Sequence, residues 1–346
     1  RELIGVTIII PAFNEAPILG AKIRNTLELV YPSHLVEVLV ITDGSTDGSD
    51  AIARAFPQVK LLHSPERLGK AMAINKAMEV VKHPVVMITD ANAMLNPEGL
   101  KWLMIHYADP TVGGVSGEKM VSEGGGNNAG ARGEGLYWMY ESFLKKNDAL
   151  VNSLVGAAGE MFSFRSKLFQ PLEPDTILDD FMLSLRICEQ GYRVEYEPRA
   201  WATEGGSLSI REEQKRKIRI AAGGFQSMDR LPFIRRFRQY PLLAFQYISH
   251  RVLRWTLAPV CLFLLAPVNL FLVVEDAGDW YRLTLLFQIV FYAAALVGWV
   301  GIRNNTKLPL LYIPYYFLFM NWAVLAGWLK YRRGAQSAQW EKAARQ

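Results

Sequence analysis

The N-terminal part of the chain alternates four times between a short apolar run and a stretch with helical spacing. Strands are expected at residues 5–10, 36–41, 59–62 and 85–88, because Val and Ile favour extended backbone. Helical periodicity is clearest in residues 16–30, where apolar side chains recur every three or four positions. This alternation predicts an α/β domain built on a doubly wound, mostly parallel sheet. Such a sheet binds its ligands at the edge where the carboxyl ends of the strands meet.

The fourth strand runs directly into polar residues. Pro84 ends the preceding helix, residues 85–88 are wholly apolar, and Asp90 and Asn92 follow. Side chains two positions apart leave an extended chain in similar directions, so two oxygen donors face the ligand-binding edge together. Hard divalent cations such as Mg²⁺ prefer oxygen ligands and pair readily with a diphosphate. The alternative is that Asp90 only caps the helix that follows.

The other turns of the alternating region add polar residues to the same edge. Right-handed crossovers bring these turns to one side of the sheet. The edge therefore gathers five side chains, those of Asn14, Glu15, Asp43, Lys70 and Asp90. The sequence has no G-x-G-x-x-G after the first strand and no phosphate-binding G-x-x-x-x-G-K-[ST], which excludes the common dinucleotide and P-loop motifs. For Lys70, a solvated lysine in the first turn of a helix stays an alternative.

The middle of the chain continues the mixed pattern. It predicts a helix at 97–107, a strand at 113–121 and a glycine-rich loop at 122–133. A helix at 134–150, a strand at 161–164 and a further helix from Asp175 onward follow. The helix at 134–150 carries an aromatic stripe, which is more often core than ligand platform. Asp179 and Asp180 stand near the start of the last helix. Acids there complement the helix dipole, or one of them serves as a general base.

Charge and hydropathy change after residue 204. Residues 204–254 contain eleven basic side chains and four acidic ones, although the net charge of the 346-residue chain is only +5. Aromatic and leucine side chains alternate with the arginines, which is typical of an amphipathic helix at a membrane interface. A nucleic-acid patch is the alternative, and the following segments disfavour it. These three apolar segments, 253–274, 283–300 and 308–329, each approach the ~20 residues of a membrane span.

The charges beside the apolar segments favour one orientation. The first connection is acidic and the second is basic, so the positive-inside rule places the arginine-rich stretch and the second connection in the cytoplasm. The basic tail after residue 330 also favours the cytoplasm, which three complete spans do not allow. Pro309, Pro314 and Asn321 make the last segment the candidate for a broken or re-entrant helix.

Taken in order, these signals resemble glycosyltransferase family 2, in its membrane-integrated branch of cellulose, hyaluronan and poly-N-acetylglucosamine synthases. The resemblance covers about residues 6–224 and rests on six short motifs, at 10–15, 43–45, 69–71, 90–92, 178–180 and the basic stretch after Gln214. It implies a GT-A-type fold. It also implies a chain divided into a catalytic domain (1–230), an amphipathic interface helix (231–252), a transmembrane region (253–330) and a basic tail (331–346).

The resemblance also implies roles for single residues. Asp180 would be the general base of an inverting transfer from a nucleotide sugar, commonly UDP-linked. Asp90 and Asn92 would hold Mg²⁺ or Mn²⁺ on the donor diphosphate. The nucleotide sugar would be bound by Ala12, Asn14, Glu15, Asp43, Lys70, Asp90, Arg216 and Arg219. The acceptor would be bound by Tyr137, Trp138, Tyr140, Gly159 and Asp179.

Three departures from the family pattern limit these assignments. Thr42 stands where the second-strand motif often has its first acid, and Asn92 where D-x-D has its second. An amide is a weaker ligand than a carboxylate, so Asn92→Asp is expected to be tolerated or to tighten cation binding. The Q-x-x-R-W motif aligns with residues 216–220, which lack both the glutamine and the tryptophan. Because Ile220 cannot stack on a sugar as tryptophan does, processivity stays open, with the aromatic helix as a substitute platform.

The sequence therefore predicts a multi-pass enzyme of the bacterial inner membrane, with its catalytic domain in the cytoplasm, that extends an exopolysaccharide. Its partners would be the nucleotide sugar, a polysaccharide or lipid-linked acceptor, membrane lipids and a subunit for export, but no nucleic acid. One alternative is transfer of a single sugar to a lipid carrier or glycolipid. Another is a catalytically silent sugar-nucleotide-binding subunit, which the presence of Asp43, Asp90 and Asp180 disfavours. A nucleotidyltransferase on the same kind of sheet is a third.

Overall fold

The fold is known from a computed structural model, which describes residues 3–122, 129–205, 210–233, 235–304, 306 and 309–337. The chain divides into two compact units. The first unit contains the described residues up to 122 and those of 141–205. The second contains residues 129–140 and the described residues of 210–336.

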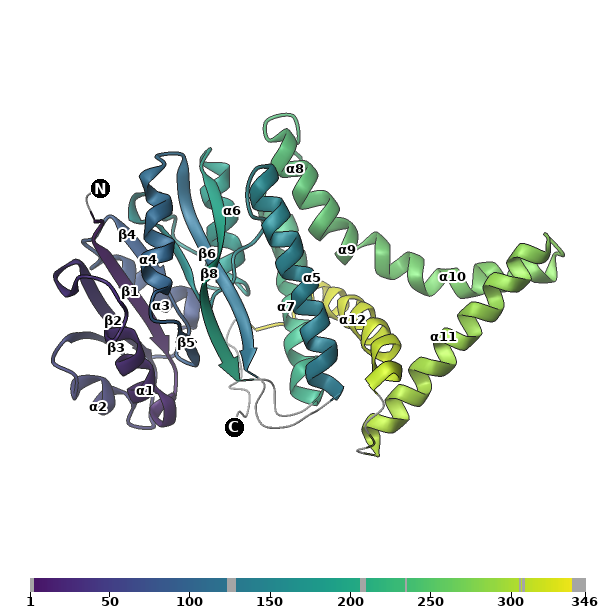
Figure 1. The fold of residues 1–346 in the computed structure, drawn as a ribbon, viewed down its shortest axis with the longest axis horizontal. Coiled ribbons are helices and arrows are strands. Elements are labelled where there is room, and N and C mark those ends of the chain that lie inside the picture. Colours follow the sequence, from purple (N-terminus) through teal and green to yellow (C-terminus); the bar gives the residue numbers. More distant parts are fainter. Residues whose placement is uncertain are drawn as a thin grey trace. The chain divides into compact units, whose positions relative to one another are not determined.

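The parallel part of the sheet is formed by the four strands expected from the sequence. They are β1 (Val6–Ala12), β2 (Val36–Asp43), β3 (Val59–Ser64) and β4 (Val85–Ile88). Their spatial order is β3-β2-β1-β4 and all of these neighbours are parallel. Val6 opposes both Val36 and Val85 in the register, so the carboxyl ends of the strands meet at one edge of the sheet (Figure 1).

The sheet continues beyond β4 with strands from later in the chain. They are β7 (Phe162–Arg165), β6 (Val112–Ser122), β8 (Arg193–Gly205) and β5 (Ala93–Leu95), in that spatial order. β7 is antiparallel to β4 and β6, β8 is parallel to β6, and β5 is antiparallel to β8. The sequence analysis missed β5 and β8. β5 is very short, and Pro198 and several charges in β8 argue locally against a central strand.

Helices cover the sheet of the first unit. They are α1 (Ala16–Leu27), α2 (Ser49–Arg54), α3 (Lys70–Met78), α4 (Gly99–Met104) and α6 (Asp179–Glu189), with α5 (Ala129–Val151) shared between the units. Short 3₁₀ turns follow at Ser33–Leu35, Ile105–Ala108 and Ser166–Leu168. Leu19 of α1 and Leu103 of α4 share one core cluster with Ile8 of β1. α1 and α4 therefore pack on the same face of the sheet.

Two helices begin elsewhere than expected. α5 begins at Ala129, inside the stretch expected to be a loop, rather than at residue 134. The alanines among the glycines there favour helix. α6 begins at Asp179 rather than near Asp175, because residues 173–176 form a turn closed by a hydrogen bond from Thr176 N to Glu173 O of 3.0 Å. Asp179 and Asp180 consequently occupy the first turn of α6.

The second unit is helical in its described part. It contains α7 (Ile210–Arg230), α8 (Pro241–Tyr247), a π-helical turn (Ile248–Val252), α9 (Leu253–Trp255), α10 (Leu257–Val274), α11 (Asp279–Arg303) and α12 (Pro309–Arg332). Within the stretch expected to form one interface helix, the regular helix begins only at Pro241. Before it in the sequence, the buried ring of Phe233 packs edge-on against Tyr240 and Tyr247.

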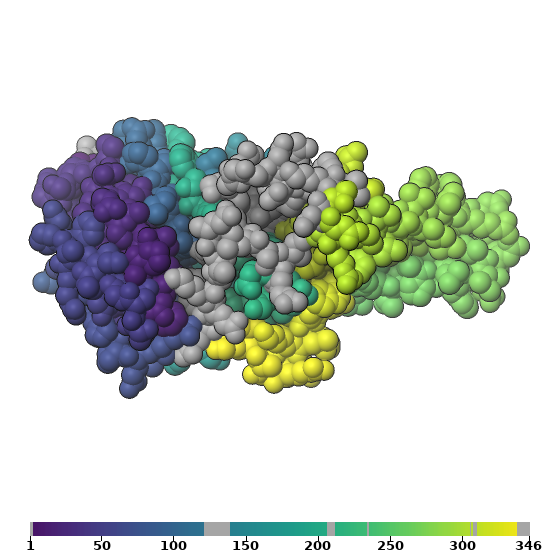
Figure 2. Space-filling view, turned by 90° about the horizontal axis from the view of Figure 1, so that it is seen from below, coloured from purple at the N-terminus to yellow at the C-terminus, as the bar shows by residue number. Residues whose placement is uncertain are grey.

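The apolar segments form helices long and apolar enough to cross a membrane. Among the described residues these are Leu257–Val274, Asp279–Arg303 and Leu310–Arg332. In Figure 2, α10 and α11 are the green segments, and few of their residues are buried. The expected break in the last segment is absent, since α12 is continuous. Pro309 begins the helix, where no N–H is needed, and Asn321 Nδ2 donates to Phe317 O of its own helix at 2.9 Å.

Candidate active site

Lys70 lies at the centre of a cluster of carboxylates at the carboxyl edge of the sheet. It is the first residue of α3. Its Nζ is 2.7 Å from Asp90 Oδ1, beyond β4, and 3.0 Å from Asp179 Oδ2, in the first turn of α6. Burial lowers the pKa of Lys70, but the carboxylates of Asp179 and Asp90 reverse this and raise the net value. The solvated-lysine alternative is therefore wrong, because the Lys70 side chain is only 15% exposed.

Asp180 has different surroundings from its neighbour in the sequence. Burial, and next the negative charge of Asp179, raise the pKa of Asp180 to about 7. Gly159 lies beside this carboxylate and leaves room for it because glycine has no β-carbon. A β-carbon at this position would lie 3.1 Å from Asp180 Oδ2 and 3.3 Å from Lys70 Nζ. A carboxyl group with a pKa near neutrality can accept a proton from a hydroxyl group and release it again.

Asp43 organises the loop that leads to Lys70. Its Oδ1 accepts a hydrogen bond from Leu68 N at 2.9 Å, and its Oδ2 accepts one from Gly69 N at 2.7 Å. Gly69 has a φ of 97°, a backbone conformation that side chains with a β-carbon rarely adopt. The buried carboxylate at the end of β2 therefore fixes the residue immediately before α3, and with it the start of the helix that presents Lys70.

The turn after β1 is tied to the turn after β2. Asn14 Oδ1 accepts a hydrogen bond from Thr46 N at 2.8 Å, and Asn14 N donates to Ser45 Oγ at 3.1 Å. Glu15 is buried, and its backbone N donates to Ser49 Oγ at 3.0 Å. Ala12 is buried at the end of β1. The predicted edge residues thus occupy adjoining turns, as the parallel topology requires.

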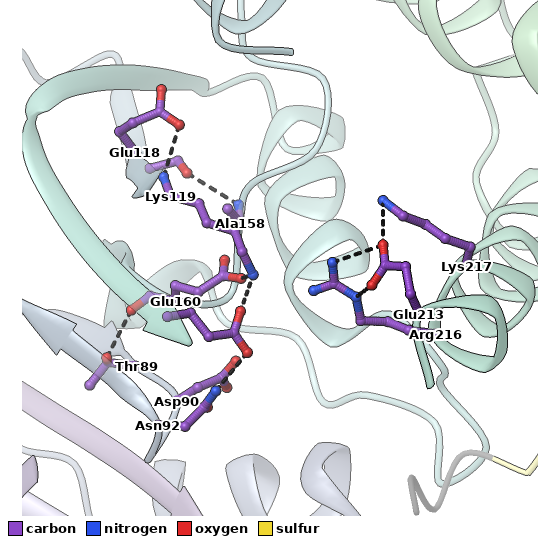
Figure 3. Close-up of polar contacts among 12 residues, drawn as sticks. Thr89, Asp90, Asn92, Glu118, Lys119, Ala158, Glu160, Glu213, Arg216 and Lys217 are labelled. Carbon is purple, nitrogen blue, oxygen red and sulfur yellow. Dashed lines mark hydrogen bonds and ion pairs between the residues drawn. The ribbon is translucent and has the colours of Figure 1, made fainter. Parts of the chain in front are cut away.

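Asn92 is held by a chain of buried charges that the sequence analysis missed. Its Nδ2 donates to Glu204 Oε1 on β8 at 2.6 Å. Lys119 on β6 forms ion pairs with both Glu204 and Glu160 (Figure 3). Burial raises the pKa of Glu160, but the Lys119 ammonium outweighs this, and the pKa falls to about 2. These partners lie far apart in the sequence, so no local pattern marks them.

Lys22 was also missed. It belongs to α1, and its side chain is completely buried beneath the turn that carries Asp90 and Asn92. Its Nζ donates to Thr89 Oγ1 at 2.8 Å and to the Ala93 carbonyl oxygen. Burial lowers the pKa of Lys22 to about 7, although the charge of Asp90 raises it. A lysine on an otherwise apolar helix face is the only signal that could have indicated this contact.

The residues of this cluster fit a divalent cation. Asp90, Asp179 and Asp180 all act on the one ammonium group of Lys70, so negative charge is in excess. Burial raises the pKa of Asp90, and Lys70 offsets only part of this effect, so a further positive charge would favour the ionised form. Among the described residues, no three His, Cys, Asp or Glu side chains form a ready metal cage. Mg²⁺ usually binds through one or two protein carboxylates and takes its other ligands from phosphate groups and water.

The remaining predicted residues lie on α7 and α5. Arg216 and Arg219 are on α7 in the second unit, where Arg216 Nε pairs with Glu213 at 3.0 Å and Lys217 Nζ with the same carboxylate at 3.4 Å (Figure 3). Tyr140 is exposed on α5. The side chains of Tyr137 and Trp138 lie outside the described residues.

Comparison with known proteins identifies the sheet domain. Residues 7–172 match glycosyl transferase family 2. This part of the chain belongs to that family. Poly-β-1,6-N-acetyl-D-glucosamine synthase of Staphylococcus aureus is 24% identical over 262 residues, which are 72% of this chain and 62% of the relative. The chain thus spans less than two thirds of that protein. The synthase of the same name from Staphylococcus epidermidis is 21% identical over 319 residues, 88% of this chain and 74% of the relative.

A solved structure has the same fold. A mannosyltransferase from Pyrobaculum calidifontis, in complex with GDP-Man and Mn²⁺, matches with a TM-score of 0.70 and 23% identity, over 97% of this chain and 89% of that one. The expected GT-A-type fold with a mostly parallel sheet is confirmed. The resemblance to the membrane-integrated branch of family 2 is confirmed as well, by the relatives and by the apolar helices.

Proposed function

We propose that the protein is a membrane-bound inverting glycosyltransferase that extends a polysaccharide from a UDP-linked sugar donor. The observation that carries this proposal is the convergence of Lys70, Asp90, Asp179 and Asp180 at the ligand-binding edge of a family 2 sheet. The names of the staphylococcal relatives favour N-acetylglucosamine as the sugar. GDP-mannose, the ligand of the solved relative, is the rival donor.

In this proposal Asp180 is the general base. The acceptor hydroxyl attacks the anomeric carbon, its proton passes to Asp180, and the bond from that carbon to the diphosphate breaks. Because the hydroxyl attacks from the face opposite the nucleoside diphosphate, which leaves with the bonding electrons, the configuration inverts. A pKa near 7 suits Asp180 to this exchange. Asp179 is ion-paired with Lys70, which leaves Asp180 as the better proton acceptor.

The other residues bind and orient the donor. Asp90 and Asn92 would hold Mg²⁺ or Mn²⁺, which supplies positive charge for the leaving diphosphate. Asp43 would contact the base or ribose, beside Ala12, Asn14 and Glu15, as the family resemblance implies. Arg216 and Arg219 would add charge on the diphosphate. Gly159 and Asp179, with the aromatic residues Tyr137, Trp138 and Tyr140, would border the acceptor.

Transfer of a single sugar is the second candidate function. Ile220 favours it, because an aliphatic side chain on α7 stands where polymer-forming members carry a tryptophan. The product would then be a lipid or glycolipid that carries one added sugar, whatever the donor concentration. A silent sugar-nucleotide-binding subunit would bind donor and release no diphosphate.

One experiment separates these functions. Membranes containing the protein are incubated with a panel of labelled nucleotide sugars, including UDP-N-acetylglucosamine and GDP-mannose, and the product is sized. We expect a polymer from a UDP-linked donor, loss of product in EDTA and recovery with Mn²⁺ or Mg²⁺. Asp90→Ala should be inactive, because an ion with so few protein ligands cannot lose its carboxylate. Full turnover in chelator, or no release of nucleoside diphosphate from any donor, would contradict the proposal.

A further inference from the structure

The amide of Asn92 is oriented by a carboxylate on a distant strand. Asn92 lies in the turn between β4 and β5, and Glu204 lies near the end of β8, opposite Ala93 in the β5–β8 register. The hydrogen bond from Asn92 Nδ2 to Glu204 Oε1 is 2.6 Å long, and the Glu204 side chain is only 8% exposed. Because the nitrogen of the amide faces Glu204, the oxygen, which is the only atom of this group that can bind a cation, points the other way.

The Glu204 carboxylate is itself fixed in place. Its second oxygen, Oε2, pairs with the ammonium group of Lys119 on β6, which also pairs with Glu160 in the turn before β7. Lys119 is buried, with a side chain 5% exposed. A buried chain of paired groups such as this one holds its members in a single arrangement, because each unpaired charge would cost desolvation energy. One ammonium group already serves two carboxylates here, so it cannot neutralise a third.

We propose that Glu204 is a positioning residue that sets the orientation of Asn92 for cation binding and requires residue 92 to be an amide. An aspartate at position 92 has no hydrogen to donate, so two carboxylates would face each other at hydrogen-bonding distance in a buried place. The result reverses the expectation from sequence alone, that Asn92→Asp is tolerated or beneficial. It rests on the proposed function, in which Asp90 and Asn92 hold the cation.

A set of four proteins tests the proposal: the wild type, Asn92→Asp, Glu204→Gln, and the double variant. Binding of Mn²⁺ is measured on detergent-purified full-length protein in the presence of UDP, from the electron paramagnetic resonance signal of free Mn²⁺. Loss of the hydrogen bond that orients a metal ligand typically costs roughly 10- to 100-fold in metal affinity, and Asn92→Asp removes that hydrogen bond. We expect a loss of this size for Asn92→Asp in the wild-type background.

The double variant gives the decisive result. With glutamine at position 204, an aspartate at 92 gains a hydrogen-bond donor and no longer faces a second negative charge. We therefore expect Asn92→Asp to preserve or tighten Mn²⁺ binding in the Glu204→Gln background, so that the double variant binds better than Asn92→Asp alone. Asn147→Asp on α5 is the control for added charge, since Asn147 Nδ2 donates to a carbonyl oxygen of its own helix, Phe143 O, at 2.7 Å.

The Mn²⁺-binding measurements test the role of Glu204 separately from the experiment that tests sugar transfer. If Asn92→Asp binds Mn²⁺ as tightly as the wild type, or loses the same factor in both backgrounds, Glu204 does not position Asn92. If the wild type binds no Mn²⁺ with UDP, the positioning role also fails, whereas product formation in the donor panel decides separately whether the protein transfers sugar. Circular dichroism and gel filtration of all four proteins exclude loss of folding as the cause.

Discussion

Among single residues, the adjacent acids Asp179 and Asp180 have different partners and different surroundings, although both lie in the first turn of α6. Asp179 forms an ion pair with Lys70. The pKa of Asp180 is raised to about 7 by burial and by the charge of Asp179. A carboxyl group is a base only when it is ionised, so its activity as a base is present above pH 7 and lost as the pH falls through that value.

The first prediction concerns Asp180. Asp180→Asn should lower the transfer rate by roughly 10²- to 10⁴-fold, the usual contribution of a general base, and should leave binding of the donor nucleotide intact. The wild-type rate should rise with pH through about 7. The measurement is a pH–rate profile from release of nucleoside diphosphate, with the exposed Asp175→Asn as control. Retained activity in Asp180→Asn together with loss in Asp179→Asn would assign the base to the other acid.

The second prediction concerns the space beside Asp180. A β-carbon at Gly159 would lie within 3.1–3.3 Å of Asp180 Oδ2 and Lys70 Nζ, so Gly159→Ala should displace the reacting groups. The neighbouring groups must shift by a few tenths of an ångström, and since a misplacement of about 1 Å can cost about 10²-fold in rate, we expect a loss of about tenfold or less. Gly20→Ala on α1 is the matched control, because its β-carbon would only make ordinary contacts, the nearest at 3.6 Å. Steady-state kinetics with both variants should show the loss in Gly159→Ala alone; equal rates would place the acceptor elsewhere.

Among secondary-structure elements, the β4–β5 turn depends on a helix that lies far from it in the sequence. Lys22 of α1 donates to Thr89 Oγ1 on one side of the turn and to Ala93 O on the other. Thr89 Oγ1 in turn donates to Glu160 O at 2.8 Å. The β4–β5 turn is therefore held from α1 and from the residues just before β7 at once.

The third prediction tests this support. Lys22→Met keeps the length of the buried side chain but removes the hydrogen bonds across the turn. Mn²⁺ affinity in the presence of UDP should fall by about tenfold or more, as for other residues that orient metal ligands. Lys101→Met, at an exposed position on α4, should have no effect. If Lys22→Met binds Mn²⁺ like the wild type, Lys22 only fills space beneath the turn.

For the whole molecule, α11 sets the expected orientation in the membrane. It is 25 residues long, or about 37 Å at 1.5 Å per residue, enough to cross a hydrocarbon core of ~30 Å. An acidic connection precedes it and a basic one follows. By the positive-inside rule its N-terminal end is expected to face away from the cytoplasm.

The fourth prediction follows from that orientation. Single cysteines are placed at the two ends of α11, as Asp279→Cys and Arg303→Cys, in a chain whose own Cys188 and Cys261 are replaced by serine. A membrane-impermeant maleimide should label Asp279→Cys in spheroplasts, which are cells whose outer barrier has been removed and whose inner membrane is intact. It should label Arg303→Cys only in inside-out vesicles. The reverse pattern would place the catalytic domain on the opposite side from the one expected.

The sequence by itself determined the features that arise from neighbouring residues. β-Branched runs identified β1 to β4, and helical periodicity identified α1 and α3, because both depend on local backbone preference and side-chain period. Apolar length indicated the candidate membrane helices. Parallel topology then sufficed to bring Asp43, Lys70 and Asp90 to one edge of the sheet.

The tertiary structure alone decided which groups contact one another at that edge. Asn92 and Glu204 are 112 residues apart, and Lys119 on β6 and Glu160 in the turn before β7 join the same group of contacts. Likewise, the local sequence shows Lys22 only as a charge on an otherwise apolar helix face, and β8 only as a charged segment with a proline. Contacts of this kind form only when distant segments are packed together, because burial makes each charge depend on a partner that no short stretch of sequence contains.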